Sequence, residues 1–374
     1  MIRSSPSLQR SIYILFFSFL VISGLYFAQN FLIPLAISSL LAMLFVPLSR
    51  WLENKGISRM FAGGICVLIF LLGTGTIIGI LSWQASGISE DLTEITQRIS
   101  MIANDLREFI ARNIGISSEK QKQWMLNQTN GSATTIGIAG LVLGSLMNII
   151  IQFILVLVYL FLFIYYRSHL KKFILMLVPV GETVETEKII SDAGKVAQKY
   201  LSGVSSMIVI LWIMYAAGFS IVGVKNALFF AVLCGLLEIL PFIGNFTGTV
   251  ITALAVISQG GSDNMIIGVI VTYLIIQFIQ TYFLEPLVVG SEVNINPLFT
   301  ILVIVFMEIV WGIAGMILAI PMLGIVKIIC DHVTTLKPYG FLIGRAKSDK
   351  HPRLIIKLQN WLGLNDKNSK ATSN

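Results

Sequence analysis

Three glutamates lie in or beside long apolar blocks of the sequence, away from the loops that carry most of its charge. Glu238 and Glu308 lie inside such blocks, and Glu285 lies at the edge of one. A charged side chain at the centre of a bilayer costs roughly 2.5 to 3.5 kcal/mol on insertion scales, so it usually faces a cavity or a partner. A buried carboxyl group can also bind and release a proton near neutral pH. These carboxylates are candidates for proton or ion binding. The alternative is a structural hydrogen bond to a neighbouring helix, or, for Glu285, a position at the membrane interface.

The apolar block at residues 227–258 is interrupted directly after Glu238, which makes this glutamate the strongest of the three candidates. Pro241 removes a backbone donor, and Gly244 and Gly248 allow bending or close approach of another segment. Each half of the block has about 14 residues, too few to cross ~30 Å of hydrocarbon at about 1.5 Å per residue. The pattern predicts a broken or re-entrant helical hairpin whose carbonyls near residues 237–241 lack partners.

The block at residues 297–326 is interrupted at Gly312 and is too long for one ordinary span. It predicts a second broken hairpin. Glu308 precedes its interruption within Met-Glu-Ile, a faint echo of the Leu-Glu-Ile around Glu238 that is weak evidence for a repeat. Secondary transporters use pairs of broken helices to hold substrate and coupling ion near the bilayer midplane.

Polar side chains also share one face of the helix predicted at residues 265–284. They are Gln277 with Gln280 and Thr281, three and four positions further on. These side chains either line the same cavity as the glutamates or form hydrogen bonds to a neighbouring helix. The predicted site residues are Glu238, Pro241, Gly244, Gly248, Gln277, Gln280, Glu285, Pro286, Glu308 and Gly312.

Enzyme signatures are mostly missing from the sequence. It contains neither GxxxxGK[ST] nor HExxH, its histidines lie outside the predicted spans, and no predicted span contains an aspartate. Cys66, Cys234 and Cys330 have no paired spacing, which argues against disulfides and a zinc site. We therefore expect no catalytic residues, no cofactor and no metal.

The composition is that of a membrane protein. Hydrophobic residues make up 56% of the chain and charged residues 12%, whereas a soluble domain carries about a quarter charged residues. The net charge of +7 comes from basic residues at block ends and in the tail, which indicates membrane orientation rather than nucleic-acid binding. We predict an all-α, polytopic integral membrane protein with about seven or eight hydrophobic segments.

The distribution of charge divides the chain into segments and places both termini in the cytoplasm. Gln29 and Asn30 are predicted to form the tight turn of an N-terminal hairpin. The predicted order is that hairpin with a third span at 1–83, an extracytoplasmic helical segment at 84–135, a fourth span at 136–166, a cytoplasmic interfacial helix at 167–202, a C-terminal transmembrane core with the broken hairpins at 203–330, and a basic cytoplasmic tail at 331–374.

A heptad seam of apolar residues runs through residues 88–109 in the predicted outer segment. It either packs on its own domain or pairs with a copy of itself in an oligomer.

Residues 235–321 carry a set of short motifs that together are fairly specific. They are Glu238-x-x-Pro241-x-x-Gly244-x-x-x-Gly248, the run from Gln277 to Pro286 with Gly290, Asn296-Pro297-Leu298, and Gly312-x-x-Gly315-x-x-x-Ala319-x-Pro321. With these motifs the chain resembles the AI-2E permeases, a family named for export of the quorum signal autoinducer-2. The resemblance implies a bacterial plasma-membrane protein that forms homo-oligomers, and relatives have been assigned to autoinducer-2 export or sodium/proton antiport.

The leading hypothesis is a secondary permease or exporter of a small polar solute, signal molecule or ion. It is coupled to protons or Na⁺ through Glu238, with Glu308 in support. A passive channel or efflux pore, in which the glutamates set cation selectivity, is the second hypothesis. A membrane scaffold acting through the heptad helix is the third. The expected partners are the lipid bilayer, the substrate and further copies of the chain, in the bacterial inner membrane.

Overall fold

The computed structural model describes residues 6–89, 135–240, 243–289 and 295–345. Within these ranges the chain forms helices and no strand, and seven helices are long and apolar enough to cross a membrane. This confirms the predicted all-α polytopic class. The predicted heptad seam at 88–109 lies outside the described residues, except for residues 88 and 89 at the end of the third helix. The tail after residue 345 also lies outside them.

The elements follow one another along the chain with short connections. They are α1 (Pro6–Phe27), α2 (Gln29–Asn54), α3 (Arg59–Ser89), α6 (Thr135–Met176), a 3₁₀ turn η1 (Val180–Glu182), α7 (Thr183–Val222), α8 (Ala227–Leu237), α9 (Ile243–Ser258), α10 (Asp263–Ile279), a π-helical segment η2 (Gln280–Val289), α11 (Pro297–His332), a 3₁₀ turn η3 (Thr334–Leu336) and α12 (Lys337–Ile343).

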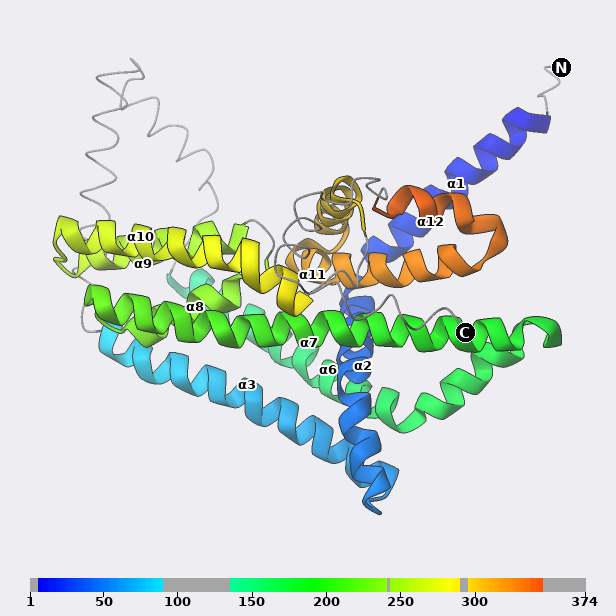
Figure 1. Cartoon of the computed structure of the whole chain (residues 1–374), viewed down its shortest axis with the longest axis horizontal. Coiled ribbons are helices and arrows are strands. Elements are labelled where there is room, and N and C mark those ends of the chain that lie inside the picture. The colour runs from blue at the N-terminus through cyan, green and yellow to red at the C-terminus, as the bar shows by residue number, and fades with distance from the viewer. Residues whose placement is uncertain (1–5, 90–134, 241–242, 290–294, 346–374) are drawn as a thin grey trace, which may run out of the picture.

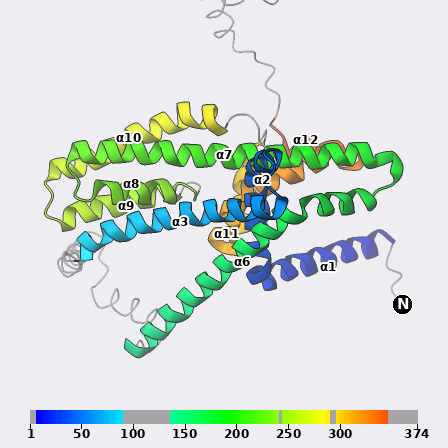
Figure 2. The ribbon, with the colours of Figure 1, turned by 90° about the horizontal axis from the view of Figure 1, so that it is seen from below.

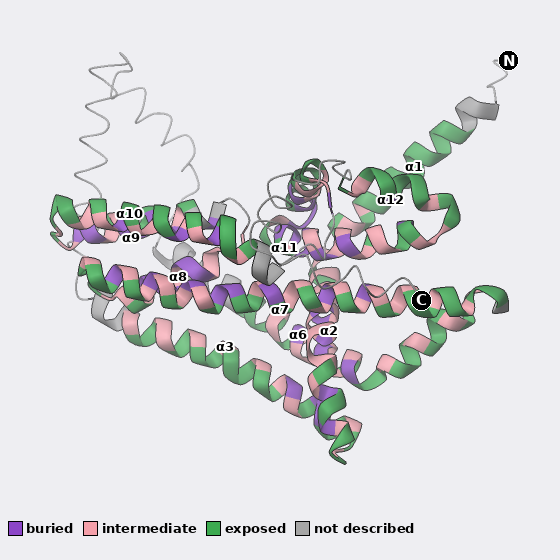
Figure 3. Cartoon of the chain, in the orientation of Figure 1, coloured by how far each residue is buried: buried purple, intermediate pink, exposed green. Residues whose placement is uncertain are grey.

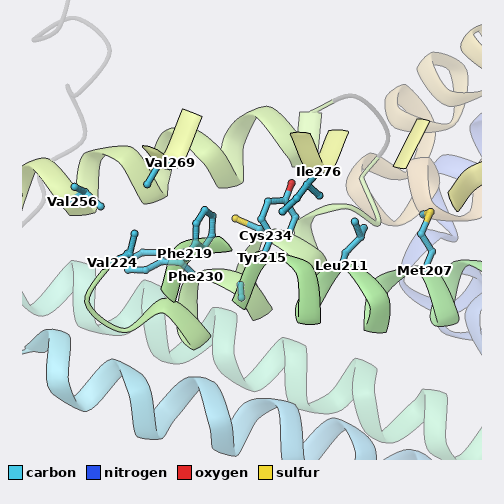
Figure 4. Packing of buried hydrophobic residues seen from close by; sticks show 11 residues of the cluster. Met207, Leu211, Tyr215, Phe219, Val224, Phe230, Cys234, Val256, Val269 and Ile276 are labelled. Carbon is cyan, nitrogen blue, oxygen red and sulfur yellow. The ribbon is translucent and has the colours of Figure 1, made fainter. Parts of the chain in front are cut away.

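Helix α7 is the central element of the molecule. It runs along the long axis between α9 and α10 on one side and α3 on the other (Figure 1), and it packs against α2, α8, α10 and α11. Its C-terminal half carries Tyr215 and Phe219. Both are fully buried in an apolar cluster with α8, α9 and α10 (Figure 4). By contrast, α1 and α3 expose most of their apolar side chains (Figure 3), as helices that face lipid do.

The first two helices differ from the predicted hairpin. The Ala28 N–H donates to the Gly24 carbonyl at 3.0 Å and the Leu32 N–H to the Ala28 carbonyl at 2.9 Å, so helical hydrogen bonding continues through the junction. The chain bends there instead of reversing, and α1 leads away from the body towards the N-terminus (Figures 1 and 2). The junction at Gln29 and Asn30 contains neither glycine nor proline, the residues that favour a tight reversal of the chain.

The predicted interfacial helix at 167–202 is also not a separate element. Residues up to Met176 extend α6, and the rest belongs to η1 and the first half of α7. This helix continues without interruption into the predicted transmembrane core that begins at residue 203. No proline or left-handed residue interrupts α7 before Gly223, whose φ of 85° ends the helix. Ala193 and Ala197 are buried on this first half, and Ala197 joins a cluster with Leu40 of α2 and Ile304 of α11. One face of the segment therefore packs on protein.

A partly buried polar cluster joins α6 to the end of α2. Arg167 donates to the Glu53 carboxylate at 2.6 Å and to the Ser49 hydroxyl at 3.0 Å, and Ser49 donates to the other Glu53 oxygen at 2.9 Å. Arg59, at the start of α3, lies 3.7 Å from the same carboxylate. Three helices thus meet at one carboxylate.

The block at 227–258 forms a helical hairpin, in which α8 and α9 pack against each other on either side of a break. Two of the carbonyls predicted to be free at the break have donors. The Leu237 carbonyl accepts from Leu240 N–H at 2.9 Å, and the Leu240 carbonyl accepts from Gly244 N–H at 3.0 Å. Gly244 is needed here because a Cβ atom at this position would collide with the Leu237 carbonyl.

The second apolar block is also broken, at Gly312, whose φ of 59° and ψ of −142° lie outside the helical region. The turn brings Gly315 so close to the Met307 carbonyl that a Cβ atom there would collide with it. The base of this bent helix is closed by the segment after α12. The Asn296 N–H donates to the Ile343 carbonyl at 2.8 Å, and Gly344 forms a bridge with Ile295. Residues 295–344 therefore form one hairpin whose two ends meet.

Replacing Gly315 with alanine tests this tight turn. We expect Gly315→Ala to destabilise the protein by about 1 to 3 kcal/mol, because the new methyl group must displace the Met307 backbone. The matched control is Gly64→Ala in α3, where nothing lies within 4 Å of the added Cβ. Thermal unfolding of the two variants in detergent measures the difference, and equal unfolding temperatures would contradict the close approach.

Candidate functional site

Glu238 and Gln280 come together at the end of two helices. Glu238 is the C-cap residue of α8, where the first break begins, and Gln280 follows the last residue of α10. The Gln280 Nε2 donates to the Glu238 Oε1 at 2.5 Å. Glu238, the strongest candidate from the sequence, therefore has a partner among the predicted site residues, although the two residues are 42 positions apart.

The position of Gln280 depends on a change of helix type. α10 ends at Ile279, and residues 280–289 continue as a π-helix, a wider form that often marks functional sites. Gln280 lies at this junction with only 1% of its surface exposed. The amide is thus held inside the protein and directed at α8, whereas its sequence neighbour Thr281 is exposed.

Two oxygen atoms of this pair remain without partners. Glu238 Oε2 and Gln280 Oε1 are buried and have no hydrogen-bond donor. Both are acceptors, so the pair presents electron-rich atoms without a donor to match them. Unpaired buried acceptors cost free energy unless a proton, a cation or a donor group binds there. The arrangement suits a cation or a hydrogen-bond donor and disfavours an anion.

Residues that the sequence analysis did not select surround this pair. Cys234 lies one helical turn before Glu238, and its Sγ is 3.6 Å from the Thr252 Oγ1 of α9. Thr252 donates to the Gly248 carbonyl at 2.8 Å, so it accepts from the thiol. Gly248 allows this contact, because a Cβ atom there would lie 2.9 Å from the Cys234 sulfur. The spacing of four between Cys234 and Glu238 is the signal that could have found this neighbour.

The other predicted residues on this side of the molecule are dispersed. Gln277 donates to the Thr281 hydroxyl at 3.2 Å on an exposed part of the helix. Glu285 lies in the π-helical segment and is exposed. The side chain of Pro286 and all of Pro241 lie outside the described residues.

The second break approaches the first through apolar residues rather than through its carboxylate. Leu240, within the first break, packs against the cluster that includes Met307 and Trp311 of α11. Glu308 lies on the exposed face of α11 and not beside Glu238. The tips of the two hairpins are therefore neighbours, but their glutamates do not form a dyad.

The described residues hold no group of three or more histidine, cysteine, aspartate or glutamate side chains that could bind a metal ion.

Comparison with known proteins gives consistent matches over most of the chain. The model of a family described as AI-2E family transporter matches residues 14–335. "Putative transport protein YrrI" of Bacillus subtilis (strain 168) is 25% identical over 315 residues, which cover 81% of this chain and 87% of the relative. "Putative permease PerM" of Escherichia coli (strain K12) is 25% identical over 312 residues, covering 81% and 87%.

A third relative extends the same pattern. "Putative transport protein YhhT" of Escherichia coli (strain K12) is 22% identical over 336 residues, covering 87% of this chain and 92% of the relative. The names of these three relatives state transport or permeation and mention no solute. They support a role in membrane transport rather than catalysis.

Substitution of Gln280 tests whether it holds Glu238 in place. We expect Gln280→Leu to destabilise the protein by about 1 to 3 kcal/mol, because the Glu238 carboxyl group loses its donor inside the protein. Asn264→Leu is the matched control, since this amide lies on an exposed part of α10. Chemical or thermal unfolding in detergent gives both values. An Asn264 variant as damaged as the Gln280 variant would contradict this role.

Proposed function

We propose that this chain, which belongs to the AI-2E family of transporters, is a secondary permease whose solute movement is coupled to protons or Na⁺ through Glu238. The solute is a small polar molecule, a signal molecule or an ion, and the direction is outward. The single observation that carries the proposal is the Glu238–Gln280 pair, whose two unpartnered acceptor oxygens are buried.

A coupling site must bind its ion reversibly, and the chemistry of this pair suits that requirement. A proton on Glu238, or a cation between Glu238 Oε2 and Gln280 Oε1, satisfies acceptors that otherwise have no partner. Neither the 227–258 block nor the 265–284 helix contains a lysine or arginine, so no fixed positive charge competes for the site. Release of the ion restores the unsatisfied state, which gives the occupied and empty forms different energies.

The location at a helix break supplies the second requirement, which is a way to change conformation. The break lies between α8 and α9, and its Leu240 contacts the cluster near the break in α11. Broken helices near the bilayer midplane are a recurrent way for transporters to link ion binding to movement. Occupancy of Glu238 can therefore shift the packing between the two hairpin tips.

The proposal includes assembly and orientation in the bacterial inner membrane. Glu308 is exposed on the apolar helix α11, where direct contact with hydrocarbon costs several kcal/mol. Contact with a second copy of the chain or with a water-filled path removes that cost. The basic residues at the ends of the apolar blocks favour a cytoplasmic position for both termini.

Substitution of Glu238 by its neutral isostere tests the coupling. We expect Glu238→Gln to reduce ion-driven flux by at least about tenfold, because a permanently neutral side chain no longer binds and releases a charge. Flux is measured in proteoliposomes with an imposed pH or Na⁺ gradient, using a panel of small polar solutes and ions. The matched control is Asp263→Asn, which removes an exposed carboxylate at the start of α10 and should leave flux near the wild-type value.

The same vesicles distinguish a carrier from a passive channel. A coupled permease concentrates its solute against a gradient when the ion gradient is imposed, whereas a channel only equilibrates it. Unchanged accumulation by Glu238→Gln protein of normal abundance would contradict the proposed role of this glutamate.

A further inference from the structure

The contact between Glu238 and Gln280 joins two planar groups along one edge only. The Gln280 Nε2 donates to the Glu238 Oε1 at 2.5 Å, while the second oxygen of the carboxyl group and the amide oxygen are buried without a partner. A carboxyl group and a primary amide each carry their two polar atoms on one carbon. Once one edge of such a pair is joined, rotation about the terminal side-chain bonds, which are soft, is enough to bring the second edge together.

The charge of Glu238 decides whether this second edge forms. While the carboxylate is ionised, Glu238 Oε2 and Gln280 Oε1 can only accept, so neither satisfies the other. A protonated carboxyl group has one O–H donor. A proton on Oε2 can therefore donate to the Gln280 Oε1, and the acid and the amide then exchange two hydrogen bonds, one in each direction. One proton satisfies both unpartnered oxygens, with no further ligand.

A sodium ion at the same place needs more oxygen atoms than the pair provides. Hard cations such as Mg²⁺ and Ca²⁺ bind about six or more oxygens, whereas the pair offers two. The carbonyls of Cys234, Leu237 and Leu240, within about one helical turn of Glu238, already accept from backbone amides at 2.9 to 3.1 Å. The chemistry of the described residues thus suits a proton better than a metal cation.

The ionisable side chains that interact electrostatically with Glu238 bring no positive charge. They are Cys234 of α8, Tyr215 of α7, Tyr273 of α10 and Glu285 of the π-helical segment. Tyr215 is fully buried, and Gln280 is 1% exposed. Among the described residues, a negative charge on Glu238 therefore gains no attraction from this set, whereas a bound proton removes that charge.

We propose that Glu238 and Gln280 form a proton-selective acid–amide pair, so that the ion bound at this site is H⁺ and not Na⁺. The inference rests on the proposed function and names the coupling ion of the same site. With the proton bound, two hydrogen bonds tie the end of α8 to the start of the π-helical segment. Loss of the proton opens one edge and leaves two acceptors unmatched, so the proton sets how firmly the first break is held.

Glu238→Gln tests the pair directly, because the new amide closes the second edge without a proton. Its N–H can donate to the Gln280 Oε1 at any pH, whereas the wild-type side chain donates only when protonated. We expect the variant to unfold about 1 to 4 °C above wild type at about pH 9, and the difference to disappear at about pH 5. Thermal unfolding of the full-length protein in detergent measures both values. Asp263→Asn, at an exposed carboxylate that begins α10, is the matched control and should follow wild type at both pH values.

Sodium is tested in the same assay at about pH 9 by exchanging potassium chloride for sodium chloride at equal concentration. A proton-selective pair predicts equal unfolding temperatures of the wild-type protein in the two salts. Stabilisation by Na⁺ that Glu238→Gln abolishes would overturn the proposal. A Glu238→Gln protein without the gain at about pH 9 would overturn it as well.

Infrared difference spectra give a second measurement that does not depend on stability. Acidification of the wild-type protein should produce the carbonyl band of a protonated carboxylic acid. The part of this band that belongs to Glu238 should be missing in Glu238→Gln, present in Asp263→Asn, and unchanged when Na⁺ replaces K⁺. Identical bands in wild type and Glu238→Gln would show that Glu238 binds no proton in this range.

None of these measurements involves solute or flux, so they separate the acid–amide pair from the proposed function. If Na⁺ stabilises the protein and Glu238→Gln still abolishes ion-driven flux, the permease proposal stands and the proton-selective pair does not. If the pair binds its proton as expected and flux is unaffected by Glu238→Gln, the pair stands and its role in coupling does not.

Discussion

A helix that bends or breaks within a membrane leaves backbone groups that water cannot reach, and each of these groups needs a partner from the protein itself. The described breaks meet this constraint in different ways. At Ala28 the backbone bonds continue through the bend, and the nearby Leu25 carbonyl accepts from the Trp311 indole at 3.0 Å. At the α8–α9 break the carbonyls bond to amides a few residues away. Gly244 and Gly315 then let the returning segments lie directly against a carbonyl.

At the first break the Leu237 and Leu240 carbonyls have donors, whereas two nearby side-chain oxygens do not. Glu238 Oε2 and Gln280 Oε1 are left without a partner between the end of α8 and the start of the π-helical segment. An ion or proton that enters there completes a network that the protein leaves incomplete. Selectivity for positive or hydrogen-donating ligands follows from this chemistry.

The breaks could be predicted from sequence because proline and glycine act locally. Pro241, Gly244 and Gly312 stand out in otherwise apolar blocks, and Glu238 stands out as a charge beside them. The partner of Glu238 was only one of several polar residues on a predicted helix face. An ordinary helix places Gln277 and Gln280 on one face, and it does not show which of them the packing directs inward.

Longer-range features could not be predicted for a related reason. The reversal expected at Gln29 and the interfacial helix expected at 167–202 were inferred from charge and polarity alone, which mark where water is tolerated but not how helices continue. Burial of Ala193 and Ala197 by other helices decides that α7 runs on without interruption. The exposed position of Glu308 likewise depends on packing around Gly312, since the sequence environments of the two glutamates look alike.

The bridge between Ile295 and Gly344 makes residues 295–344 a closed ring in mechanical terms. In an open hairpin one helical arm can slide past the other, whereas a hairpin whose two ends are joined cannot slide in this way. The compliant point of that ring is Gly312, the residue with non-helical dihedrals inside α11. At the tip the Trp311 indole donates to the Leu25 carbonyl, so the same ring connects α12 at its base to α1 at its tip.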